Sequence, residues 1–111
     1  SAGETSAAIR ARVNRARQFA HARYAGDGET IRCNADLSAR QTERYCALSD
    51  SARDLLRVAF DALGMSARGY DRILRLGRTI ADLDGADVIT DKHISEAIML
   101  RSLDQKYFLE A

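Results

Sequence analysis

Residues 66–83 read SARGYDRILRLGRTIADL, a stretch with the periodicity of an amphipathic helix that carries arginines along one side. At about 100° per residue, Arg68, Arg72 and Arg75 fall within about 60° of one another. The opposite side holds the apolar and small residues Tyr70, Ile73, Leu74, Gly77, Ile80 and Ala81. We therefore expect one face of this helix to lie in a core and the other to be cationic, with Arg78 at the edge of the cationic face.

The N-terminal part of the chain also has helical spacing. Apolar residues recur at positions i, i+4, i+7 and i+11, namely Ile9, Val13, Ala16 and Ala20, and form a stripe on one side of a helix. This stripe predicts a helix from about Thr5 to Tyr24. Two glycines in residues 25–30 end that helix, and a loop is expected up to about Asp36. Ser38 can then cap a short helix that ends near Cys46.

Capping residues divide the rest of the chain into helices. Ser49 or Asp50 can begin a helix that Gly64 ends. Its broad apolar stripe consists of Ala52, Leu55, Leu56, Ala59, Phe60 and Leu63. Gly85 ends the arginine helix, and Thr90 can cap a last helix with Ile94, Ala97, Ile98 and Arg101 at helical spacing. No period-two pattern is long enough for a strand, although Val88 and Ile89 can pair briefly. The sequence predicts an all-α bundle of four or five helices in one domain.

Composition narrows the classes of function. The chain has 111 residues, 46% of them hydrophobic, and a net charge of +1 from 17 basic and 16 acidic residues. This balance argues against a dedicated binder of nucleic acid or acidic membranes. All cations except Lys92 and Lys106 are arginine, a bias that favours planar contacts with carboxylates or phosphates. No apolar run approaches the ~20 residues of a membrane helix, and the start has no signal-peptide pattern, so we expect a cytoplasmic protein.

Residues with reactive side chains are few and scattered. Cys33 and Cys46 form no CxxC pair, so we expect neither a metal site nor a disulfide, with Cys46 in the core and Cys33 in a polar loop. His21 and His93 are expected at the surface or in helix caps. Tyr45, Phe60 and Tyr70 are expected in the core. Because the chain has no phosphate loop, GxGxxG, HExxH or nucleophile elbow, we do not expect an enzyme on its own.

Arg68 has the least ordinary position of the arginines. It lies in the first turn of its helix, where a cation opposes the positive end of the helix dipole at a cost of roughly 0.3 to 1 kcal/mol. An anion held at this N-terminus would gain from both the dipole and the guanidinium. The alternative is a surface arginine paired with Asp71. In that interpretation the rest of the face is solvated, with Asp71 to Arg75 and Arg78 to Asp82 pairs.

The motifs around this helix resemble a known family. The chain resembles the C-terminal helical domain of bacterial magnesium-chelatase-like AAA+ ATPases of the ComM or YifB type. The stretches that carry the resemblance are residues 63–75, 78–83 and 93–97, together with 9–13, 16–18 and 37–48. The similarity runs from about Ile9 to Arg101, which leaves an N-terminal extension at 1–8 and a C-terminal tail at 102–111. The sequence departs from the family pattern in two ways. Asp71 stands where a neutral or basic residue is expected, and Gly69 and Gly77 stand where the family usually has alanine.

The resemblance implies a lid rather than a whole ATPase. In this family an upstream AAA+ core carries the Walker motifs and binds ATP and Mg²⁺, and the lid supplies a sensor-2 arginine. Arg68 matches that arginine by its place at the start of the helix, and Arg72 and Arg75 are secondary candidates for phosphate or interface contacts. The resemblance further implies a homo-hexamer in the full-length protein, with a role in DNA branch migration or competence.

Two other classes of function stay open from the residues alone. A small helical module could bind DNA or protein through the arginines of the first helix: Arg10, Arg12, Arg15, Arg17 and Arg23. The third possibility is a free-standing enzyme.

Overall fold

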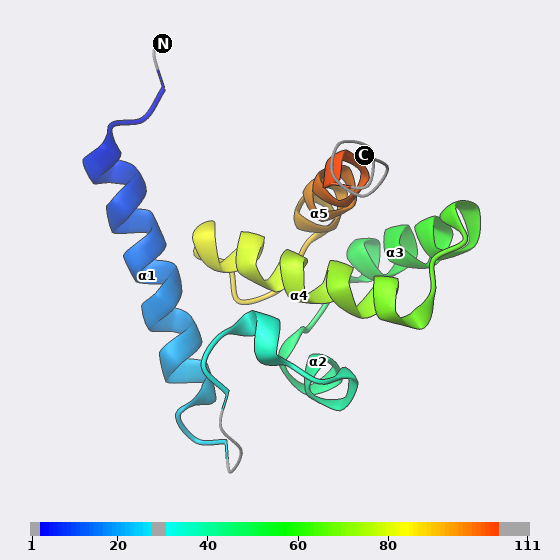
Figure 1. Cartoon of the computed structure of the whole chain (residues 1–111), viewed down its shortest axis with the longest axis horizontal. Coiled ribbons are helices and arrows are strands. Elements are labelled where there is room, and N and C mark those ends of the chain that lie inside the picture. The colour runs from blue at the N-terminus through cyan, green and yellow to red at the C-terminus, as the bar shows by residue number, and fades with distance from the viewer. Residues whose placement is uncertain (1–2, 28–30, 105–111) are drawn as a thin grey trace.

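A computed structural model describes residues 3–27 and 31–104, and helices make up most of this part of the chain (Figure 1). The elements are α1 (Ser6–Tyr24), a short 3-10 helix η1 (Asn34–Asp36), α2 (Ala39–Tyr45), α3 (Asp50–Leu63), α4 (Ala67–Leu83) and α5 (Asp91–Asp104). The predicted all-α fold is confirmed. None of the described helices is long and apolar enough to cross a membrane.

The arginine helix α4 lies at the centre of the arrangement. It packs against α5, α1, η1 and α2, while α3 packs mainly against α5. Figure 1 shows α1 crossing near one end of α4, with α3 and α5 near the other parts of it. The helix predicted from the arginine-rich stretch 66–83 is therefore the one that contacts most of the other elements.

The predicted serine caps begin α2 and α3 where the sequence places them. Ser38 and Gln41 form a reciprocal capping box, in which the Ser38 hydroxyl accepts from the Gln41 backbone N–H at 3.2 Å. Ser49, rather than Asp50, caps α3, and its hydroxyl accepts from the backbone N–H of Ala52. Gly64 ends α3 in the left-handed conformation at φ 60°, which a glycine adopts without steric cost.

His93 stabilises the start of α5. Its Nδ1 accepts a hydrogen bond from the Thr90 backbone N–H at 2.9 Å. Because Nδ1 is an acceptor, the N–H of the imidazole ring is at Nε2. This Nε2 lies 2.9 Å from a carboxylate oxygen of Asp84. This bond lowers the pKa of Asp84, and the charge of Lys92 adds to the effect. The expected capping role of His93 is confirmed, although the side chain is buried and not at the surface.

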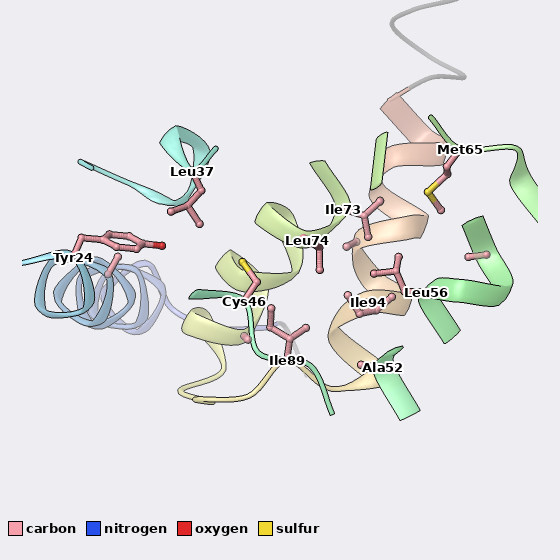
Figure 2. Packing of buried hydrophobic residues seen from close by; sticks show 14 residues of the cluster. Tyr24, Leu37, Cys46, Ala52, Leu56, Met65, Ile73, Leu74, Ile89 and Ile94 are labelled. Carbon is pink, nitrogen blue, oxygen red and sulfur yellow. The ribbon is translucent and has the colours of Figure 1, made fainter. Parts of the chain in front are cut away.

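The core collects buried side chains from α1, α3, α4 and α5 and from the segments between helices (Figure 2). Ile73 and Leu74 of α4 lie among Leu56 of α3 and Ile94 of α5. Ile89 also enters this core, because its backbone pairs with Leu48 in one parallel bridge. The brief pairing expected at residues 88 and 89 is thus present.

Some residues expected in the core are exposed. In α1 the stripe is buried at Ala16 and Ala20 but not at Ile9, which is 44% exposed, because α4 covers only the C-terminal part of α1. In α3, Phe60 and Leu63 are exposed as well. Phe60 instead makes an edge-to-face contact with the half-buried ring of Tyr70, with ring centroids 5.9 Å apart.

Candidate functional site: the N-terminal half of α4

The N-terminus of α4 is fixed by a serine cap. The Ser66 hydroxyl accepts a hydrogen bond from the Gly69 backbone N–H at 3.0 Å, and Met65 just before it is buried. Arg68, the second residue of the helix, is exposed. Among the described residues it forms neither a hydrogen bond nor an ion pair, so the alternative pairing with Asp71 is not formed. The Arg68 guanidinium is available to a ligand at the end of the helix that favours anions.

The other two predicted site residues lie along the same side of α4 but differ in burial. Arg72 is exposed. Arg75 is half-buried, and its Nη1 donates to the backbone carbonyl of Leu37 at 3.3 Å. Arg75 therefore holds the segment after η1 instead of forming the expected pair with Asp71.

Arg72 and Arg75 meet a third arginine in a cleft between α4 and α5, beside η1. The cleft has a volume of about 390 Å³. Its walls combine the apolar side chains of Ile73, Leu76 and Leu100 with the cationic side chains of Arg72, Arg75 and Arg101. We call it the arginine cleft. No aspartate or glutamate is among the described residues that line it.

Arg101 is the site residue that sequence reasoning missed. Its side chain is half-buried, and its Nη2 lies over Gly69, where an ideal Cβ would be only 2.9 Å away. Its Nε atom is buried and has no hydrogen-bond acceptor. The signal was present in the spacing: Arg101 occupies an inward position of α5, in register with Ile94 and Ala97, where an apolar residue is expected.

Arg78 corrects the expectation of a solvated edge. The side chain is 1% exposed, and it pairs with Asp82 as foreseen, but inside the protein. Its two terminal nitrogens also donate to the backbone carbonyls of Ala86 and Asp87. The buried arc of α4 is wider than the apolar pattern predicts, because the segment after α4 binds Arg78 and Arg23 of α1 binds Asp82.

Asp82 connects α4 with two distant segments. Arg23 of α1 donates to it at 3.0 Å, and so does the side-chain amide of Asn34 in η1. These contacts span 59 and 48 residues of sequence, so periodicity along one helix carries no signal for them. The network leaves Arg23 unsuited to the DNA contact considered for the first helix.

The remaining reactive side chains agree with their expected places. Cys46 is buried, and its burial raises the thiol pKa to about 11, whereas Cys33 is exposed; both are free thiols. His21 is exposed. Within residues 3–27 and 31–104, no group of three His, Cys, Asp or Glu side chains is placed to hold a metal ion.

A family model described as "Magnesium chelatase, subunit ChlI C-terminal" matches residues 3–101. The chain belongs to this family. The match contains α4 with Arg68, Arg72 and Arg75, and it ends at Arg101. The similarity to ComM and YifB proteins expected from the sequence motifs is confirmed.

Relatives of this magnesium chelatase C-terminal domain are much longer proteins. The chain is 41% identical over 101 residues to the competence protein ComM of Haemophilus influenzae, covering 91% of this chain and 19% of that protein. It is 34% identical over 105 residues to YifB of Salmonella typhimurium, covering 95% and 20%. A Mycobacterium bovis protein is 39% identical over 83 residues, covering 75% and 16%. The chain thus spans about a fifth of the length of these relatives. No solved structure matches it.

Proposed function

We propose that this chain is the lid domain of a magnesium-chelatase-like AAA+ ATPase and that Arg68 is its sensor-2 residue, in contact with the phosphates of ATP. The observation that carries the proposal is the exposed guanidinium in the first turn of α4 with no partner among the described residues. A cation at this end of a helix is electrostatically unfavourable unless an anion binds there. Membership of the magnesium chelatase family supports an ATPase context for the domain.

The role of Arg68 in this proposal is electrostatic. Guanidinium N–H groups donate to phosphate oxygens, and the positive charge stabilises the charge that develops on them during phosphoryl transfer. ATP and its Mg²⁺ would be held by an upstream AAA+ core of the same polypeptide. The proposal includes a homo-hexamer in the cytoplasm with DNA as a partner, and in such a ring the lid can complete its own site or that of a neighbouring subunit.

The test uses the full-length protein that carries this domain. Arg68→Ala should lower the steady-state rate of ATP hydrolysis by about 10²-fold, the effect of removing one preorganised charge donor from a transition state. Arg53→Ala is the matched control, because Arg53 is an exposed arginine on α3 with only a loose pair to Asp50 at 3.9 Å. Circular dichroism should show equal helix content in all three proteins. A turnover by Arg68→Ala within twofold of the parent would contradict the assignment.

DNA binding through α1 has weaker support from the geometry. Arg23 donates to Asp82, and Arg12 pairs with Glu4, so two of the five arginines considered already have acceptors within the domain. Arg10, Arg15 and Arg17 are exposed. Three cations on one helix, without aromatic side chains between them, do not make a base-stacking surface.

A further inference from the structure

The environment of Arg101 differs from that of the other inward-facing arginines. Arg78 has acceptors in Asp82, Ala86 and Asp87, and Arg23 has acceptors in Asp82 and Asn34. Arg101 has none among the described residues, although its Nε is fully removed from solvent. A buried donor without an acceptor destabilises the fold, and it does so more strongly when the group is charged. The fold alone therefore leaves Arg101 unfavourably placed.

No described residue that lines the arginine cleft around Arg101 carries a negative charge. The arginine cleft is lined by three guanidinium groups. Its apolar walls lower the local dielectric constant, which strengthens any interaction with an anion that enters. Arg101 also lies against Gly69, in the first turn of α4, where the helix dipole adds positive potential.

We propose that the arginine cleft binds a phosphate group and that Arg101 is its principal ligand. The cleft presents Arg101 of α5 and Arg75 of α4 to one anion. Two cations match the multiple charges of a phosphate or polyphosphate better than the single charge of a carboxylate. The source of this phosphate rests on the proposed function, in which a triphosphate reaches the adjacent Arg68. Arg101 would then extend the phosphate contact from the tip of α4 into the cleft.

Gly69 has a part in this site. With glycine at this position, the Arg101 guanidinium can lie directly on α4, because an alanine Cβ would stand 2.9 Å from Nη2 and 3.3 Å from Cζ. Alanine would therefore push the guanidinium outwards without removing its charge. The same change improves helix propensity, so it displaces Arg101 without weakening the helix itself.

The experiment is an NMR titration of the ¹⁵N-labelled 111-residue chain with sodium tripolyphosphate at constant ionic strength. The Arg101 Nε–H cross-peak should shift and report a dissociation constant. Arg101→Gln, followed through its backbone amides, should weaken binding at least tenfold, and Gly69→Ala should weaken it several-fold. Arg53→Gln, which removes an exposed charge on α3, should bind tripolyphosphate with a dissociation constant within twofold of that of the parent.

Three results would overturn the proposal. The first is an Arg101 cross-peak that does not move with tripolyphosphate, and the second is equal weakening by Arg53→Gln, which indicates diffuse charge attraction. The third is binding of the dicarboxylate glutarate as tight as that of tripolyphosphate, which would assign the cleft to carboxylates. If Arg101→Gln does not fold, the dissociation constant of Gly69→Ala for tripolyphosphate tests the proposal instead, and a value equal to that of the parent would overturn it. Tripolyphosphate binding by the arginine cleft and ATP turnover by Arg68→Ala are measured separately. The phosphate-site proposal and the sensor-2 proposal can therefore fail independently.

Discussion

At the scale of single residues, environment gives chemically identical arginines different roles. Arg68 is exposed and without a partner among the described residues, Arg78 is buried with its nitrogens bonded, and Arg101 is half-buried with Nε unsatisfied. Helical spacing identified Arg68 as exposed because that depends on α4 alone. It failed for Arg78, since the side chain is enclosed by the segment after α4, whose Ala86 and Asp87 carbonyls accept its hydrogen bonds.

Asp82 carries the negative charge of the buried network, so its removal should be costly. Asp82→Asn leaves the charges of Arg78 and Arg23 uncompensated, and we expect the free energy of unfolding to fall by about 3 kcal/mol. Chemical denaturation followed by circular dichroism measures this change. Asp54→Asn, which breaks an exposed pair with Arg57, should change it by less than about 1 kcal/mol. Equal effects of the two substitutions would show that the Asp82 network contributes no more than a surface pair.

At the scale of helices, the close approach of α4 and α5 depends on Gly77. A Cβ at this position would lie 3.2 Å from Cδ1 of Ile94 and 3.4 Å from Cγ2 of Ile89, both fully buried side chains. The glycine noted as a departure from the family pattern is thus explained by packing. The sequence shows that a glycine interrupts a helix former, but not which side chains occupy the space.

Gly77→Ala should therefore destabilise the domain despite its better helix propensity. Overpacking costs about 1–3 kcal/mol and the propensity gain is at most about 1 kcal/mol, so we expect a net loss of about 1 kcal/mol. Ile94→Val removes the crowded Cδ1, and the double variant should lose less stability than the sum of the two single variants. Additive losses in thermal or urea unfolding would show that α4 and α5 move apart instead.

At the scale of the whole molecule, the two cysteines report on different parts of the structure. Cys46 lies at the end of α2 inside the core, while Cys33 lies in the exposed segment before η1. A thiol with a pKa of about 11 is almost entirely protonated near neutral pH, and burial also keeps reagents away from it. Cys46 is accordingly protected as long as the core stays closed.

A disulfide reagent such as Ellman's reagent should modify one thiol per folded chain rapidly at about pH 8, and the second only when denaturant is added. Cys33→Ser should abolish the rapid reaction in the folded chain, and Cys46 should still react once denaturant is added. Two rapid thiols in the folded chain would mean that the core around α2 opens readily.

The helices, most of their caps, the cationic side of α4 and the family could be predicted from the sequence, because each depends on neighbours within a few residues or on a linear motif. Three features required the folded chain: which arginines are buried, the connection of α1 and η1 to α4 through Asp82, and the cleft that Arg101 lines with Arg72 and Arg75. The physical reason is that burial and hydrogen-bond partners are set by segments far apart in the chain. Periodicity along a single helix contains no information about what packs against it.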